Sequence, residues 1–62
     1  MNTKREFESY FRREILPAVR ARFEKDGVPD RAARREVWIT QIDTLEKDGQ
    51  IPERARDWLC PW

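Results

Sequence analysis

The chain has 62 residues and a formal net charge of +1, with 39% of its residues hydrophobic and 40% charged. A domain this short buries only about 60% of the surface that its unfolded chain exposes, so a disulfide, a metal ion or a partner subunit usually adds stability. One cysteine and no histidine exclude an internal disulfide and a Cys/His zinc cluster, which leaves self-association or binding to a partner.

The first predicted helix begins near Thr3 and ends before Gly27. Thr3 and Glu6 match the capping box, in which each side chain accepts a backbone N–H at the other's position. Apolar residues then recur at helical spacing, and they are Phe7, Tyr10, Phe11, Ile15, Val19 and Phe23. Pro17 removes one hydrogen bond and clashes one turn back, so we expect a kink or two abutting helices. Gly27 suits the left-handed position after the helix.

A second helix is predicted from Asp30, an acceptable N-cap, to about Lys47, and it ends at Gly49 by the same device as the first. Its apolar face is formed by Trp38, Ile42 and Leu45, flanked by Ile39. A short third helix over residues 53–59 would pack back on the core. The expected fold is all-α, with one domain over residues 1–62. It is a small helical hairpin or three-helix domain with a long kinked first helix, and we expect the domain to self-associate.

A loose internal repeat relates residues 12–27 to residues 34–49. Both copies begin with Arg-Arg-Glu and end with Glu-Lys-Asp-Gly. Two copies are fewer than the three that a solenoid needs, so we interpret them as a pseudo-symmetric pair of helical hairpins. The alternative is two helix ends that use the same stop signals.

Charge is uneven along the chain. Residues 1–22 carry six basic and three acidic groups, whereas residues 37–53 carry one basic and four acidic groups. Opposite charges on the two halves favour antiparallel docking, within the monomer or across a two-fold dimer.

No pattern of catalytic or metal-binding residues is present. The segment from Asp48 to Ile51 resembles the middle of an EF-hand loop, but Thr44 would occupy the first ligand position and Ala55 the twelfth, so calcium is excluded. Without histidine, Cys60 has no neighbouring base to activate it, and so small a chain can hardly enclose two carboxylates in a dry cleft. We therefore predict no enzyme, no cofactor and no metal.

Arginine is the abundant basic residue, and one group of arginines lies along the first helix opposite its apolar face. This group contains Arg5, Arg12, Arg13 and Arg20. A solvated face, with ion pairs to neighbours such as Glu8, is the favoured interpretation, and a surface that contacts phosphate groups is the alternative.

A second group, Arg31, Arg34 and Arg35, lies in the first turns of the second helix, where the helix dipole disfavours positive charge. The group is on the same side as Trp38, and tryptophan with arginine is typical of binding hot spots. The alternative, weighed equally, is that Trp38 belongs to the core and the arginines cover its rim with their aliphatic stems.

The C-terminal half, residues 37–61, resembles short uncharacterised open reading frames of bacteriophages and mobile elements. The residues that carry the resemblance are Trp38, Asp43, Leu45, Asp48, Gly49, Gln50, Ile51, Trp58 and Pro61. It implies an accessory protein of phage origin that binds a host or phage factor, and it transfers no catalytic residue.

The leading functional hypothesis is a non-enzymatic protein-interaction module that inhibits or modulates a host or phage protein. The residues predicted to contact the partner are Arg31, Arg34, Arg35 and Trp38, followed by Arg12 and Arg13. A helix-turn-helix-like nucleic-acid-binding domain is the alternative, and an assembly subunit is a third possibility. No apolar run approaches the roughly 20 residues of a membrane span, and no signal peptide is recognised, so we expect a cytoplasmic protein.

Overall fold

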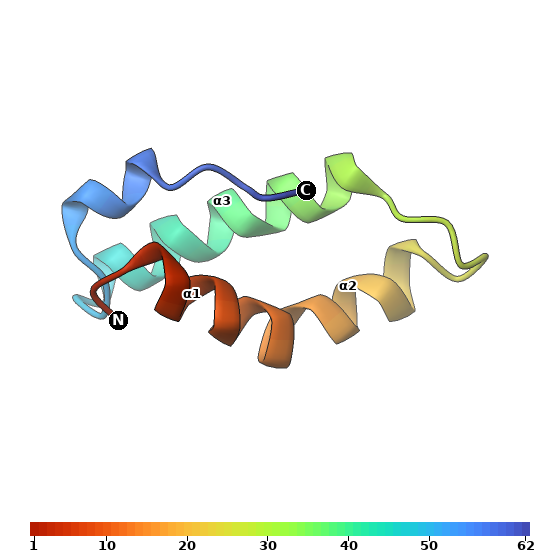
Figure 1. Ribbon diagram of the computed structural model, residues 1–62, viewed down its shortest axis with the longest axis horizontal. Helices are drawn as coiled ribbons and strands as arrows, with labels where there is room; N and C mark the ends of the chain where they lie inside the picture. The colour runs from red at the N-terminus through yellow and green to blue at the C-terminus, as the bar shows by residue number, and fades with distance from the viewer.

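The computed structural model describes all 62 residues and contains helices but no strand, which confirms the all-α prediction. In chain order the elements are α1 (Lys4–Tyr10), the π-helix η1 (Phe11–Ile15), α2 (Leu16–Phe23), α3 (Arg31–Lys47) and the 3₁₀-helix η2 (Glu53–Asp57). Figure 1 shows α1, η1 and α2 forming one bent rod that lies antiparallel to α3, while the segment after η2 returns along α3. None of these helices combines the length and the apolar character needed to cross a bilayer.

The first rod stays helical through Pro17 because a π-turn precedes the proline. The N–H of Leu16 donates to the carbonyl of Phe11, five residues back, and Pro17 follows in the first turn of α2. A turn of this kind takes up one extra residue and bends the helix. The predicted kink is therefore present as a bend within a continuous rod.

The extra residue shifts the face that the rod turns toward α3. Phe7 and Phe11 are buried four residues apart, but the next buried residue is Leu16 rather than Ile15. Ile15 is half-buried and Phe23 is exposed. The helical spacing expected from the sequence was therefore wrong at Ile15 and Phe23, because it assumed a regular α-helix through the proline, whereas Val19 is buried as expected.

Both long elements begin at the predicted caps. Thr3 Oγ1 accepts the N–H of Glu6 at 3.2 Å, and Asp30 Oδ1 accepts the N–H of Ala33 at 3.0 Å. The carboxylate of Glu6 receives the N–H of Asn2 and the hydroxyl of Thr3. Only the first half of the expected capping box is therefore formed.

The helix ends differ more than the repeat suggests. Gly49 has φ +74°, its N–H donates to Glu46 O at 2.9 Å, and the N–H of Gln50 donates to Leu45 O at 2.9 Å. This pair of bonds is the Schellman motif. Gly27 also has positive φ, +82°, but it lies in a turn beyond the end of α2, with its N–H bonded to Glu24 O.

The core lies between the bent rod, α3 and the C-terminal segment. Its buried apolar residues are Phe7, Phe11, Leu16, Val19, Trp38, Ile42, Leu45, Ile51 and Ala55. The ring of Trp38 meets Phe7 edge-on at 4.5 Å between centroids and Phe11 at 5.3 Å. Its indole N–H donates to Trp58 O at 2.9 Å, which ties the segment after η2 to the core.

Candidate interaction surface

Two residues of the predicted partner-binding set do not lie on the surface. Trp38 is fully buried at the centre of the core, so the core interpretation weighed for it is the one that the structure shows. Arg34 is also buried, with its side chain 8% exposed. In this fold neither side chain is accessible to a partner, because Trp38 fills the core and Arg34 is held by a carboxylate.

The carboxylate that holds Arg34 is that of Glu24, whose side chain is 5% exposed. Arg34 Nε donates to Oε2 at 2.6 Å and Nη2 donates to Oε1 at 2.7 Å, while the N–H of Asp30 donates to Oε2 at 3.0 Å. The hydrogen bonds from Arg34 lower the pKa of Glu24, and the same pair raises the pKa of Arg34. The pair closes the connection between α2 and α3.

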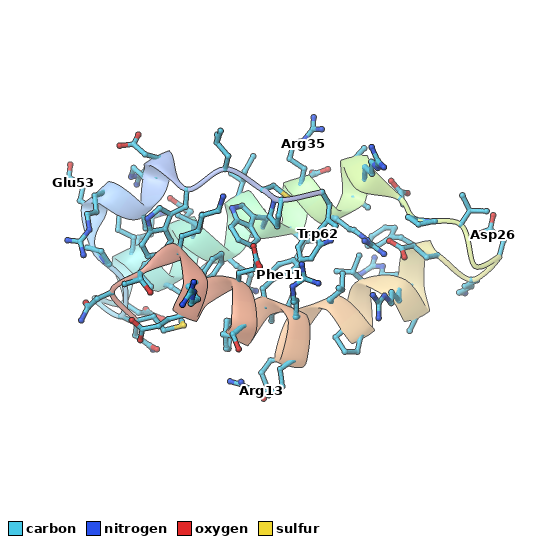
Figure 2. The ribbon with its side chains drawn as sticks, in the orientation of Figure 1. Phe11, Arg13, Asp26, Arg35, Glu53 and Trp62 are labelled. Atoms are coloured by element: carbon cyan, nitrogen blue, oxygen red, sulfur yellow. The ribbon has the colours of Figure 1, made fainter.

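Trp62 is the functional candidate that sequence reasoning missed. Its ring packs on Phe11 at 5.5 Å and on Trp38 at 6.1 Å between centroids. Figure 2 shows it lying beside Phe11, between the first rod and α3. The guanidinium carbon of Arg12 stands 4.9 Å from the ring centroid and that of Arg34 stands 5.6 Å from it. The sequence feature that could have indicated this role is a tryptophan directly after Pro61 in a chain rich in arginine.

Two exposed arginines continue this surface along α3. Arg35 lines a hollow together with Trp62 and Cys60, and Arg31 lies one turn earlier on the same side of the helix. Neither makes an ion pair, whereas Arg12 pairs with Glu8 at 3.5 Å. We call the group Arg12, Arg31, Arg35 and Trp62 the tryptophan–arginine surface.

Arg13 does not belong to this surface. It lines a different hollow with Arg5 and Tyr10 and donates to Glu14 at 3.2 Å. Figure 2 shows its side chain on the outer side of the first rod, pointing away from Trp62. The structure thus brings Arg12 together with the arginines of α3 and separates Arg13 from them.

The arrangement of α2 and α3 is that of a helical hairpin. Residues 24–30 connect them, and the two helices run side by side in Figure 1. A helix-turn-helix instead joins its two helices through three or four residues and crosses them at about 90–120°. The predicted similarity to that motif does not extend to the geometry of the turn.

No three Asp, Glu or Cys residues come close enough together to hold a metal ion. What the surface does offer is a half-buried ring with guanidinium groups around it, which suits charged and planar groups better than an apolar ligand. Comparison with protein-family models, with curated proteins and with solved structures finds no match to this chain.

Proposed function

We propose that this protein is a non-enzymatic interaction module whose tryptophan–arginine surface binds an acidic segment of a partner protein. The observation that carries the proposal is the half-buried ring of Trp62, which lies under the exposed Arg12 of the first rod and lines one hollow with the exposed Arg35 of α3. Arg31, one turn before Arg35 on α3, is also exposed, and neither of these two arginines has a carboxylate of this chain as a partner.

The chemistry of the surface favours carboxylates. A guanidinium group presents a planar fork of N–H donors that matches a carboxylate with two hydrogen bonds. An aromatic ring next to arginines supplies apolar contact at a low cost in conformational entropy, and such residues dominate measured hot spots. The buried pair of Arg34 and Glu24 fixes the start of α3, so the exposed arginines are presented from a rigid element.

We propose a host or phage protein as the partner, with this chain acting as an accessory or inhibitor protein. This setting rests on the resemblance of residues 37–61 to short phage and mobile-element reading frames. The acidic-segment chemistry rests on the tryptophan–arginine surface alone, so the two parts of the proposal stand separately.

The test is capture of partners from bacterial lysate by the tagged protein, with and without nuclease. The double variant Arg12→Glu/Arg31→Glu reverses two charges of the surface. Arg5→Glu/Arg13→Glu is the matched control, because it makes the same change in net charge on exposed residues away from Trp62. Circular dichroism checks that both variants keep the helical content of the wild type.

We expect a stoichiometric protein partner that survives nuclease, is retained by the control and is lost by the Arg12→Glu/Arg31→Glu variant. Equal retention by the two double variants would contradict the proposed surface. Retention that disappears with nuclease would instead support the nucleic-acid alternative, in which the same arginines contact phosphate groups.

A further inference from the structure

Two large apolar side chains stand exposed next to each other on the outer side of α3. Ile39 is 59% exposed and Leu59 is 76% exposed, and both line one hollow with Trp58 and Arg35. A second hollow of about 370 Å³ lies beside Ile39 and is lined also by Ile42, Asp43 and Trp58. A protruding leucine and an open hollow lined by both apolar and polar side chains thus flank the same isoleucine.

Ile39 lies between two residues of opposite charge on the same side of α3. Arg35 lies four residues before Ile39 and Asp43 lies four residues after it, so all three project on one side of the helix. Arg35 has no ion pair, and the partly exposed Asp43 has only surface pairs, with Lys47 at 3.0 Å and Arg56 at 3.5 Å. Pairs of this exposed kind are weak and readily exchanged.

We propose that a second copy of this chain docks on this face, with the two α3 helices antiparallel about a two-fold axis at Ile39. Four residues span about 6 Å along each helix, so Arg35 of each copy then faces Asp43 of the other. Leu59 of each copy enters the hollow beside Asp43 of the other copy. One patch therefore supplies both halves of the contact, as a two-fold interface requires.

Charge complementarity favours a second copy over an unrelated occupant, because the patch contains both opposite charges. It also contains both the protruding Leu59 and the hollow that would receive it. A small but specific dimer interface buries about 600 Å² per copy, a minor part of the 4482 Å² surface of the chain. Interfaces at this lower end of the size range are typical of weak, transient association. Arg35 takes part in both surfaces, and Trp62 lines the same hollow as Ile39 and Leu59, whereas Arg12 and Arg31 line neither hollow of the dimer face.

Sedimentation equilibrium of the full chain, over about 1–500 μM, tests the proposal. We expect the average mass to rise from the 7.5 kDa of the monomer to twice that value. Ile39→Glu should remain monomeric throughout. Val28→Glu is the matched control, because Val28 is 62% exposed on the connection between α2 and α3, and it should dimerise as the wild type does.

A charge exchange tests the orientation. In a dimer of Arg35→Glu, a carboxylate faces a carboxylate at both contacts between positions 35 and 43. In a dimer of Asp43→Arg, an arginine faces an arginine at both contacts, so each variant should be monomeric. An equimolar mixture of the two restores both opposite-charge pairs and should form a heterodimer. Circular dichroism confirms that each variant is folded.

A wild type that stays monomeric over the whole range would overturn the proposal, as would an Ile39→Glu variant that dimerises normally. A mixture of the two charge variants that stays monomeric would overturn the antiparallel arrangement. None of these measurements needs another protein, so their outcome is independent of the proposed function.

Discussion

Glu24 and Arg34, ten residues apart, join the end of α2 to the first turns of α3 through two hydrogen bonds of 2.6 and 2.7 Å. Glu46 and Arg56, also ten residues apart, join the end of α3 to η2 through two bonds of 2.6 and 2.8 Å. Each arginine is the fourth residue of its helix. Glu24 and Glu46 occupy the same position in the two copies of the repeat, and both turns are closed by a forked ion pair.

Burial separates the two pairs and makes them a natural comparison. Arg34 and Glu24 are almost entirely covered, whereas the Arg56 side chain is 55% exposed. We predict that Arg34→Ala lowers the unfolding temperature by on the order of 10–20 °C, because it leaves a buried carboxylate without its partner. Arg56→Ala should lower it by no more than a few degrees. Thermal unfolding followed by circular dichroism measures both, and equal shifts would show that burial does not set the strength of the pair.

The same pair makes stability depend on pH. Hydrogen bonds from Arg34 hold the pKa of Glu24 below its ordinary value of 4.5, so as the pH falls the unfolded chain takes up the proton first. The contribution of this carboxylate is complete above about pH 4.5 and is lost as the pH falls further, through the lowered pKa of the folded state. We predict that Glu24→Gln is less stable than the wild type at neutral pH and loses less stability on acidification. Unfolding temperatures between about pH 2 and pH 7 decide this, and parallel curves for the two proteins would refute it.

Local signals predicted well what depends on a few neighbouring residues. Asp30 caps α3, Gly27 and Gly49 adopt positive φ, and the bounds of α3 agree with the sequence to within one residue. Each of these features is decided by backbone chemistry within one turn. The short helix expected over residues 53–59 was predicted less well, because the structure has a 3₁₀-helix there that ends at Asp57.

Contacts between distant residues could not be predicted in this way. Arg34 looked like a misplaced surface charge because its partner, Glu24, precedes it across a turn. Trp62 gave no periodic signal, and its position depends on rings contributed by Phe11 and Trp38. Burial of a charge or of a terminal ring is a property of the assembled fold, so spacing along the chain does not reveal it.

The π-turn before Pro17 gives a prediction that separates two registers of the first rod. In a regular α-helix Ile15 would follow Phe7 and Phe11 on the core face, but the structure buries Leu16 instead. We predict that Leu16→Ala lowers the free energy of unfolding by about 2–5 kcal/mol, because it leaves a cavity in the core. Ile15→Ala should cost clearly less, since its side chain is only half-buried. Urea denaturation of both variants gives the comparison, and a larger loss for Ile15→Ala would favour the regular register.

Trp62 contributes to stability as well as to the proposed surface, because its ring covers Phe11 and Trp38. We predict that Trp62→Ala lowers the free energy of unfolding by about 1–3 kcal/mol through lost burial and lost ring contacts. Trp62→Phe should recover part of this loss, since an aromatic ring still packs against the core and under the Arg12 guanidinium. Val28→Ala, at an exposed position of the connection, should stay within about 0.5 kcal/mol of the wild type. If urea denaturation gives Trp62→Ala the same stability as Val28→Ala, the ring does not hold the C-terminal segment on the core. The arginines of the tryptophan–arginine surface would then lack the ring of Trp62, on which the proposed function depends.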